Sequence, residues 1–203
     1  MIVIVTARRG SKRCPNKNVL PFDGTNLIAR TLRQARFLNP EKIILTTDYT
    51  WSEVWDGNAP VMFDEKEYMH YFRPRKLCKD GISSEAVVKD AIRSYLIKEG
   101  KRGLDTFCLL QPTSPLRAVE TLVRAKILFE EKNFSALVSV NPAYQPNGSF
   151  YFCIWDAFLM EHSLYPKGSH FWICNWKESA DINYPWEFRI AEALDEGGVH
   201  GNL

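Results

Sequence analysis

The first candidate for chemistry is a cluster of positive charge near the start of the chain. Residues 7–18 read ARRGSKRCPNKN, and their basic side chains are Arg8, Arg9, Lys12, Arg13 and Lys17. A glycine-containing basic loop can offer backbone N–H groups and side-chain cations to a polyanion such as a nucleoside triphosphate. A solvated basic surface loop has the same composition. The element that precedes the loop therefore decides between the two interpretations.

That preceding element is a predicted buried strand. Residues 2–6 read IVIVT, a continuous β-branched run typical of a central parallel strand that is covered on both faces. Open α/β sheets bind their ligands at the carboxyl ends of such strands. The abrupt change from buried strand to charge at residue 7 favours a phosphate-binding loop.

The rest of the chain alternates between helical and strand patterns. A helix is predicted over 26–38, capped by Thr25 or Asn26, and a strand over 42–47, which together with residues 2–6 form a βαβ unit. Further helices are predicted over 84–98, 119–127, 156–161 and 185–194, and further strands over 105–110, 135–140, 150–155 and 170–175. Residues 49–79 are predicted to be irregular, with a short strand at 61–63. We expect an α/β fold of three layers, α/β/α, with a mainly parallel sheet and a single domain over residues 1–203.

Composition narrows the class of protein. The chain has 203 residues, 45% hydrophobic and 25% charged, which are ordinary globular values. A net charge of +2 argues against a nucleic-acid partner. The five cysteines are scattered, so we expect reduced thiols and neither a disulfide framework nor a zinc site. No apolar run of membrane-spanning length and no signal peptide is found, which predicts a cytoplasmic protein without a membrane partner.

Polar residues also follow other predicted strands. Asp48 closes the second strand, as a ligand-side carboxylate or as a turn residue or helix cap. Gln111, Thr113 and Ser114 follow strand 105–110. A glutamine amide donates and accepts hydrogen bonds at once, as recognition of a polyhydroxylated substrate requires. A turn built around the two neighbouring prolines is the alternative, although it does not account for the polar residues.

Four motifs together resemble a known family. The loop at 7–18 resembles the signature of the cytidylyltransferases that make CMP-activated acid sugars, the CMP-sialic acid synthetase family. LQPTSPLR at 110–117, QPNGSFYF at 145–152 and DINYPWEFRIAE at 181–192 follow in the family's order. The resemblance implies a Rossmann-like nucleotidyltransferase that transfers CMP from CTP to the hydroxyl of an acid sugar, sialic-acid-like or a related ketodeoxy sugar acid, and releases pyrophosphate.

The resemblance also implies roles for individual residues. The implied catalytic residues are Arg8, Lys12, Lys17 and Asp181. The implied nucleotide-binding residues are Arg8, Ser11, Lys12, Lys17, Asn18, Arg73 and Ser84. The implied sugar-binding residues are Gln111, Thr113, Ser114, Tyr151 and Tyr165. Arg9 and Arg13 vary in the family and are assigned only a long-range electrostatic contribution.

The family holds Mg2+ with two aspartates separated by one residue. Here the motif reads Asp181-Ile182-Asn183, so the resemblance implies Asp181 and Asn183 as ligands, the second through a neutral amide oxygen. Weaker metal affinity, a single catalytic Mg2+ and lost catalysis are the open alternatives. A catalytically weak or inactive nucleotide-binding protein, or a nucleotidyltransferase for another small acceptor, is the alternative function.

One family segment is missing. Only residues 141–145 separate strand 135–140 from the Asn147-Gly148 pair, which we expect to form the tight turn before strand 150–155. Family members carry a longer connection here, a lobe that pairs two subunits. Its absence predicts a monomer or a non-standard dimer, with CTP and a small acid sugar as the binding partners.

Overall fold

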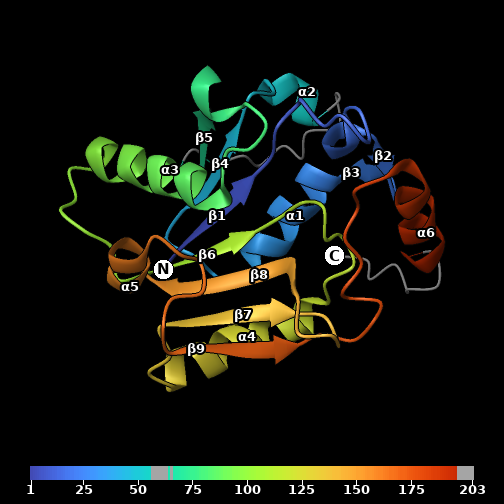
Figure 1. Cartoon of the computed structure of the whole chain (residues 1–203). Helices are drawn as coiled ribbons and strands as arrows, with labels where there is room; N and C mark the ends of the chain where they lie inside the picture. Colours follow the sequence, from blue (N-terminus) through green and yellow to red (C-terminus); the bar gives the residue numbers. More distant parts are fainter. Residues whose placement is uncertain (56–63, 65, 196–203) are drawn as a thin grey trace.

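The computed structural model describes residues 1–55, 64 and 66–195 and shows a twisted sheet between helices (Figure 1). Within these residues the sheet has seven strands, in the order β5-β4-β1-β6-β8-β7-β9. They are β1 (Ile2–Thr6), β4 (Ile43–Thr47), β5 (Tyr68–Phe72), β6 (Thr106–Leu110), β7 (Ala136–Val140), β8 (Pro146–Ile154) and β9 (Ser169–Ile173). A separate ribbon joins β2 (Pro21–Phe22) and β3 (Thr25–Asn26).

The sheet is mainly parallel, as predicted. β1 pairs in parallel with β4 and β6, β4 with β5, and β7 with β9. Among the described strands of this sheet, β8 alone runs antiparallel to its neighbours, β6 and β7. The parallel strands therefore end at one edge, to which the arrowheads of β6, β7 and β9 point in Figure 1.

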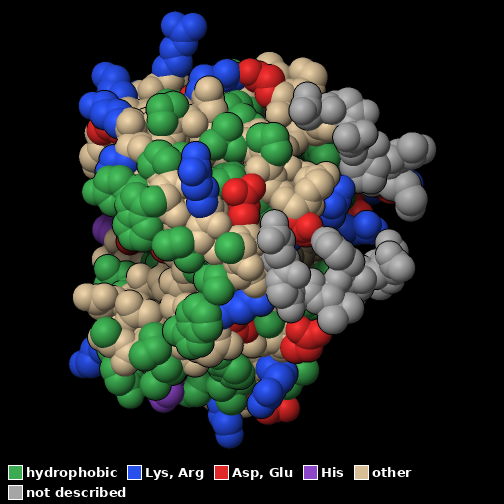
Figure 2. Space-filling model, turned by 90° about the vertical axis from the view of Figure 1, so that its right-hand side faces the viewer, with side chains coloured by type: hydrophobic (Ala, Val, Ile, Leu, Met, Phe, Trp, Pro, Cys, Tyr) green, Lys and Arg blue, Asp and Glu red, His purple; other side chains and the backbone are tan. Residues whose placement is uncertain are grey.

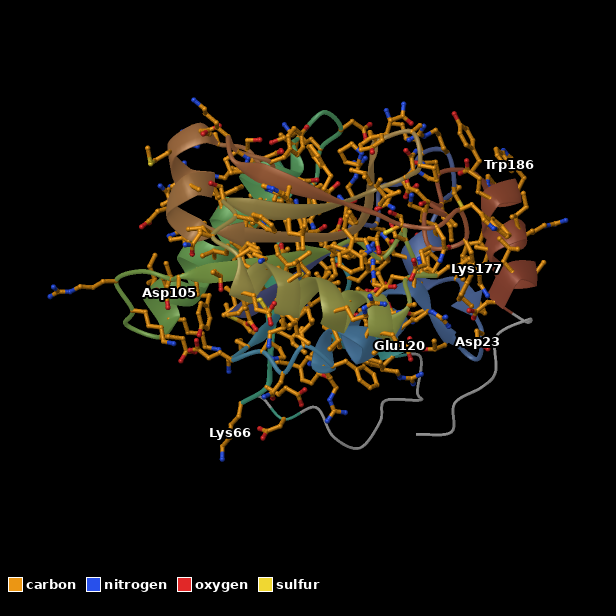
Figure 3. The ribbon with its side chains drawn as sticks, turned by 90° about the horizontal axis from the view of Figure 1, so that it is seen from below. Asp23, Lys66, Asp105, Glu120, Lys177 and Trp186 are labelled. Carbon is orange, nitrogen blue, oxygen red and sulfur yellow. The ribbon has the colours of Figure 1, made fainter. Side chains whose placement is uncertain are left out.

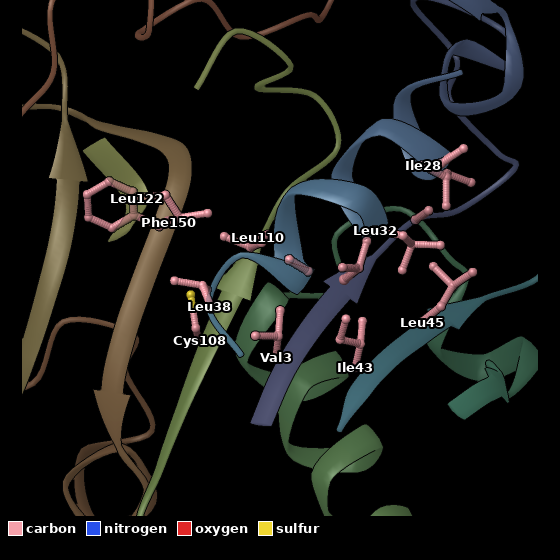
Figure 4. Packing of buried hydrophobic residues seen from close by; sticks show 14 of the residues in the cluster. Val3, Ile28, Leu32, Leu38, Ile43, Leu45, Cys108, Leu110, Leu122 and Phe150 are labelled. Carbon is pink, nitrogen blue, oxygen red and sulfur yellow. The ribbon is translucent and has the colours of Figure 1, made fainter. Parts of the chain in front are cut away.

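Helices cover both faces of the sheet, which confirms the three-layer fold class. They are α1 (Leu27–Arg36), α2 (Trp51–Trp55), α3 (Ser84–Lys98), α4 (Val119–Glu131), α5 (Trp155–Glu161) and α6 (Pro185–Asp195), with 3-10 turns η1 (Lys17–Val19) and η2 (Arg75–Leu77). Alternate residues of β1 face opposite layers: Val3 and Val5 pack with α1 and α4, and Ile2 and Ile4 pack with α3 and α5. Figure 4 shows the first of these layers around Val3, Leu32 and Leu110. Because the central strands are buried on both faces, their sequences are continuously apolar.

Two predicted helix starts are found with their caps. The Asn26 side chain accepts a hydrogen bond from the Ala29 N–H at 2.9 Å and begins α1. The Ser83 hydroxyl accepts one from the Ala86 N–H at 3.2 Å and begins α3. Each cap satisfies an N–H group that the helix itself leaves without a partner.

The prediction that residues 49–79 are irregular is wrong. This stretch contains α2, β5 and η2. β5 reads YMHYF, without apolar and polar alternation, and only its first two residues are buried. Pairing with β4, from Ile43 with Tyr68 to Thr47 with Phe72, makes it a strand at the sheet edge. The strand predicted at 61–63 lies outside the described residues.

The predicted tight turn at Asn147-Gly148 is also wrong, because both residues belong to β8. The chain turns earlier, at Asn141 to Gln145. The Asn141 side chain accepts hydrogen bonds from the N–H groups of Ala143 at 2.9 Å and Gln145 at 3.0 Å. An Asn side chain that binds its own following backbone replaces the turn chemistry expected from glycine.

Two further sequence predictions can be compared with the structure. All five cysteines are free thiols, as expected. In the described part of the chain, no helix has the length and apolar character needed to cross a membrane.

Candidate functional site

A cavity of about 480 Å3 opens at the carboxyl ends of β1, β5 and β6. Thr6 ends β1, Arg73 follows β5, and Gln111 follows β6. The walls of the cavity are formed by Thr6, Arg8, Ser11, Lys12, Arg13, Lys17, Asn18, Arg73, Leu77, Lys79, Asp80, Ile82, Ser83, Ser84, Val87, Gln111, Pro112, Thr113 and Asn183. Figure 2 shows the side of the molecule toward which the strands point, with Lys and Arg side chains set among gathered hydrophobic ones.

Two predicted phosphate-binding cations pair with the carboxylate of Asp80, a residue to which the sequence analysis assigned no role. Asp80 lies 2.8 Å from Arg8 Nη2 and 2.7 Å from Lys12 Nζ. The Arg8 guanidinium also donates to the Cys78 carbonyl at 3.2 Å. The position of Asp80 in a turn directly before Ser83 and Ser84 was the only signal in the sequence.

Lys17 and Asn18 lie deeper in the wall. Lys17 Nζ donates to the Ile182 carbonyl, and burial lowers the pKa of this amine although the nearby Asp181 carboxylate opposes the shift. The Asn18 amide donates to the Arg8 carbonyl at 3.0 Å. Its oxygen is buried and has no hydrogen-bond partner in the described structure. A buried acceptor without a partner is costly, so this atom fits a ligand donor at the cavity wall.

Arg9 does not line the cavity. Its guanidinium donates to both carboxylate oxygens of Glu53, at 2.5 and 2.6 Å, and lies over the Tyr49 ring. Its backbone N–H donates to Asp48 Oδ1 at 2.7 Å. Asp48 is not among the cavity-lining residues, so it takes the alternative of a turn residue and fixes the start of the basic loop.

Other polar side chains of the cavity wall include amides, hydroxyls and the buried Arg73. The Gln111 amide donates to the Ser84 hydroxyl at 3.4 Å. Arg73 is 4% exposed and donates to the Thr46 carbonyl at 2.8 Å, and its burial lowers the pKa of the guanidinium. Thr113 lies beside Gln111, and its carbonyl accepts from the Ile182 N–H at 2.8 Å.

Arg13 contacts the predicted metal motif, although it was assigned only a long-range contribution. Arg13 Nη2 donates to Asn183 Oδ1 at 3.0 Å, and Asn183 Nδ2 donates to Asp181 Oδ2 at 2.7 Å. A guanidinium only donates and a carboxylate only accepts, so these two partners fix the orientation of the amide between them. The Asn183 oxygen is therefore turned toward Arg13, and its second lone pair remains for a further partner.

The donor chemistry still fits one Mg2+ held mainly by substrate. The structure contains, among its described residues, no group of three or more His, Cys, Asp or Glu that could hold a metal. Asp181 is exposed and keeps one carboxylate oxygen without a contact to Asn183. Mg2+ is commonly bound by one or two carboxylates with phosphate oxygens and water. Asp181 therefore fits such an ion, and the role of Asn183 as a second ligand stays a prediction.

Four predicted site residues do not line the cavity. Ser114 is fully buried and donates to the Asn147 carbonyl at 2.7 Å. Tyr151 is 7% exposed within β8, and burial raises the pKa of its hydroxyl, as do the neighbouring Tyr165, Asp181 and Glu85. Tyr165 and Asp181 are exposed outside the cavity wall. Their roles in sugar or metal binding stay predictions.

Gly148 allows the close approach that holds Gln111. A Cβ at this position would lie 2.3 Å from Gln111 Oε1 and 3.0 Å from Ser114 Oγ, and the backbone φ is +78°. We expect Gly148→Ala to displace the Gln111 side chain and to lower the free energy of unfolding by about 1–2 kcal/mol through the left-handed backbone. Urea unfolding and the NMR signals of the Gln111 side-chain amide measure the two effects.

Gly103→Ala is the matched control, because its Cβ would meet no atom within 4 Å. Unchanged NMR signals of the Gln111 side-chain amide in Gly148→Ala would contradict the conclusion that Gly148 makes room for Gln111.

The comparisons with known proteins bear on this geometry. Residues 2–139 match a family model described as cytidylyltransferase, a stretch that includes the basic loop, Arg73, Ser84 and Gln111. The N-acylneuraminate cytidylyltransferase of Escherichia coli O18:K1:H7 is 34% identical over an alignment of 151 residues, which covers 72% of this chain and 32% of that protein. The chain thus aligns with about a third of the length of that relative.

Two other similarities extend over nearly the whole chain. The pseudaminic acid cytidylyltransferase of Campylobacter jejuni is 25% identical over 234 residues, covering 95% of each protein. This alignment is longer than the 203-residue chain, so the relative carries additional residues within the aligned region.

A structure of CMP:2-keto-3-deoxy-manno-octonic acid synthetase complexed with CTP superposes with a TM-score of 0.66 at 12% identity, covering 98% of this chain and 99% of that one. That likeness shows a shared fold. The family match, which covers well over half of the residues, goes further: this chain belongs to the cytidylyltransferases.

Proposed function

We propose that this chain transfers CMP from CTP to the hydroxyl of an acid sugar and releases pyrophosphate. The observation that carries the proposal is the cavity wall, where Arg8, Lys12 and Lys17 follow a buried parallel strand and lie on one wall with the polar side chains of Ser84, Gln111 and Thr113. The named substrates of the relatives, N-acylneuraminate and pseudaminic acid, and of the structural neighbour, 2-keto-3-deoxy-manno-octonic acid, share the acid-sugar class.

The cations of the wall suit a triphosphate. Displacement at the α-phosphate spreads negative charge over the phosphate oxygens and the departing pyrophosphate, so preformed cations lower the barrier without a covalent contribution. Arg8 and Lys12 reach the cavity from the basic loop, and Lys17 is held against Ile182. The contact between Lys17 and Ile182 holds the basic loop against the segment before α6 in the absence of substrate. This reduces the entropy cost of positioning the substrate.

The polar side chains of the wall suit the base and the acceptor. Ser84 and Gln111 offer hydroxyl and amide groups, and Arg73 closes the wall beside them. The partnerless oxygen of Asn18 accepts a hydrogen bond from a ligand N–H or O–H group. These groups position the ligand and take no part in bond cleavage.

Mg2+ is the proposed metal, with Asp181 as its protein ligand. When bound, a divalent ion of this kind neutralises phosphate charge. Arg13, held on the Asn183 amide, adds a fixed positive charge on the same wall.

Pyrophosphate release tests the proposal. The purified chain with Mg2+ is offered each of the four nucleoside triphosphates against sialic, pseudaminic, legionaminic and ketodeoxyoctonic acids. We expect release with CTP and one acid sugar. CTP binding without release for any pair would favour the nucleotide-binding alternative, for which the engaged Asn183 amide is the supporting observation.

Removal of a phosphate-facing cation should weaken CTP binding. Each charge-assisted hydrogen bond contributes about 1.5–3 kcal/mol, so Arg8→Ala or Lys17→Ala should lower CTP affinity by about ten- to a hundredfold. Isothermal titration calorimetry measures this. Arg9→Ala is the matched control, because Arg9 lies in the same loop but pairs with Glu53 outside the cavity. Equal affinity losses in all three variants would indicate a field effect of the loop.

Asn183→Asp should tighten divalent-metal binding. The new carboxylate adds a hard oxygen ligand beside Asp181, and its attraction to Arg13 competes with the metal. We expect about tenfold tighter Mn2+ binding, which electron paramagnetic resonance measures in the presence of CTP, and a further gain in Asn183→Asp combined with Arg13→Gln. A metal titration that neither variant shifts would remove residue 183 from the metal site.

A further inference from the structure

Asp80 is an acidic side chain placed among the cations of the proposed phosphate site. Its two oxygens pair separately with Arg8 Nη2 at 2.8 Å and Lys12 Nζ at 2.7 Å. It lies in the turn between η2 and α3, which is far from the basic loop in the sequence but lines the same cavity. The two cations hold the pKa of this carboxyl below its usual value, so it is an anion at neutral pH.

The contacts made by Asp80 are those that a phosphate group would make. Arginine and lysine donate to carboxylate and phosphate oxygens with the same geometry, and their donors are limited in number. A phosphate bound by Arg8 and Lys12 therefore competes with Asp80 for the same N–H groups. Asp80 is 45% exposed, and ion pairs at such exposure contribute little stability, so a polyanion displaces it readily.

The surrounding structure leaves Asp80 room to move. A second hollow of about 480 Å3 is lined by Arg8, Gly10, Ser11, Lys12, Cys78, Lys79 and Asp80. Gly81, the next residue, has a φ of +80° and no atom within 4 Å of the position that a Cβ would take. The carboxylate can thus leave the cations by a local turn of the backbone at a residue that tolerates it.

We propose that Asp80 is an internal competitor anion that sets the affinity of the site for phosphates. It neutralises Arg8 and Lys12 while the cavity is empty and yields them to the triphosphate. It recaptures them when pyrophosphate leaves, so it weakens product binding. This inference rests on the proposed function, because it assumes that Arg8 and Lys12 bind phosphate.

The test compares Asp80→Asn with Asp105→Asn by calorimetric titration of pyrophosphate and of CTP, in EDTA and again with Mg2+. Both variants raise the net charge by one, but Asp105 precedes β6 at the opposite end of the strand from Gln111. Figure 3 shows Asp105 at the far end of the molecule from Trp186 of α6. We expect about three- to tenfold tighter pyrophosphate binding in Asp80→Asn, in EDTA, and no change in Asp105→Asn.

The outcomes separate the two proposals. No binding of CTP or pyrophosphate by the parent chain or by Asp80→Asn overturns the proposed function and this inference with it. Binding by the parent chain with equal affinity in Asp80→Asn overturns the inference alone. Weaker binding in Asp80→Asn, in EDTA or only with Mg2+, also overturns it, because Asp80 would then be a ligand of the phosphate or the metal. Asp80→Ser removes the same charge and gives an independent measurement if the first variant unfolds.

Discussion

The guanidinium of Arg117 makes its hydrogen bonds to neutral acceptors while it is 3% exposed. It donates to the Ser149 carbonyl of β8 at 2.8 Å, to Gln34 Oε1 of α1 at 2.9 Å, and to the Gln111 carbonyl. A buried charge is costly unless its donors are satisfied, so all three acceptors must be held in place. Burial lowers the pKa of the guanidinium, which reports the same cost. The loop after β6 is thereby fixed to a helix and to the antiparallel strand, and the Gln111 side chain gains a defined direction toward the cavity.

The cavity depends on this anchoring because its walls come from distant parts of the chain. The basic loop, the turn before α3, the loop after β6 and residue 183 contribute cations and polar groups that no single element could carry. Lys17 donates to the Ile182 carbonyl, and Arg13 to Asn183, so the first and last of these segments are joined directly. Positive charges repel one another, and the carboxylates of Asp80 and Asp181 supply the negative charge that keeps the cations together without a ligand.

Sequence reasoning was most successful where periodicity and local chemistry agree. The run at residues 2–6 and the apolar spacing of α3 are patterns that burial on two faces or one face imposes directly. β5 was missed because its pairing with β4, and not its own pattern, makes it a strand. Gly148 was misplaced because a positive φ in a glycine serves a turn or a close approach equally well, and here the neighbour is Gln111.

The same division holds for the site. The basic loop could be recognised because five cations follow a buried strand within a few residues. Asp80 could not be recognised, because an acidic residue in a turn is common. Its partners Arg8 and Lys12 lie far away in the sequence, about as far as the 70 residues that separate Arg8 from Cys78. The Arg13 interaction with Asn183 spans 170 residues and had no local signal. Contacts between residues so far apart in the sequence depend on the whole fold, and local sequence patterns do not reveal them.

The short turn that begins at Asn141 has a consequence for the order in which the sheet assembles. β7 and β8 are neighbours in the sequence, whereas the pairs β1 with β4 and β6 with β8 are separated by whole helices. Closing a loop costs entropy that grows with its length, so among the described strand pairs of the large sheet the β7 and β8 hairpin is the least costly to nucleate. The half of the sheet that lies farther from the basic loop is thus the part best suited to fold first. It then offers β8 as a template on which β6, and through it the strands that hold the cations, are added.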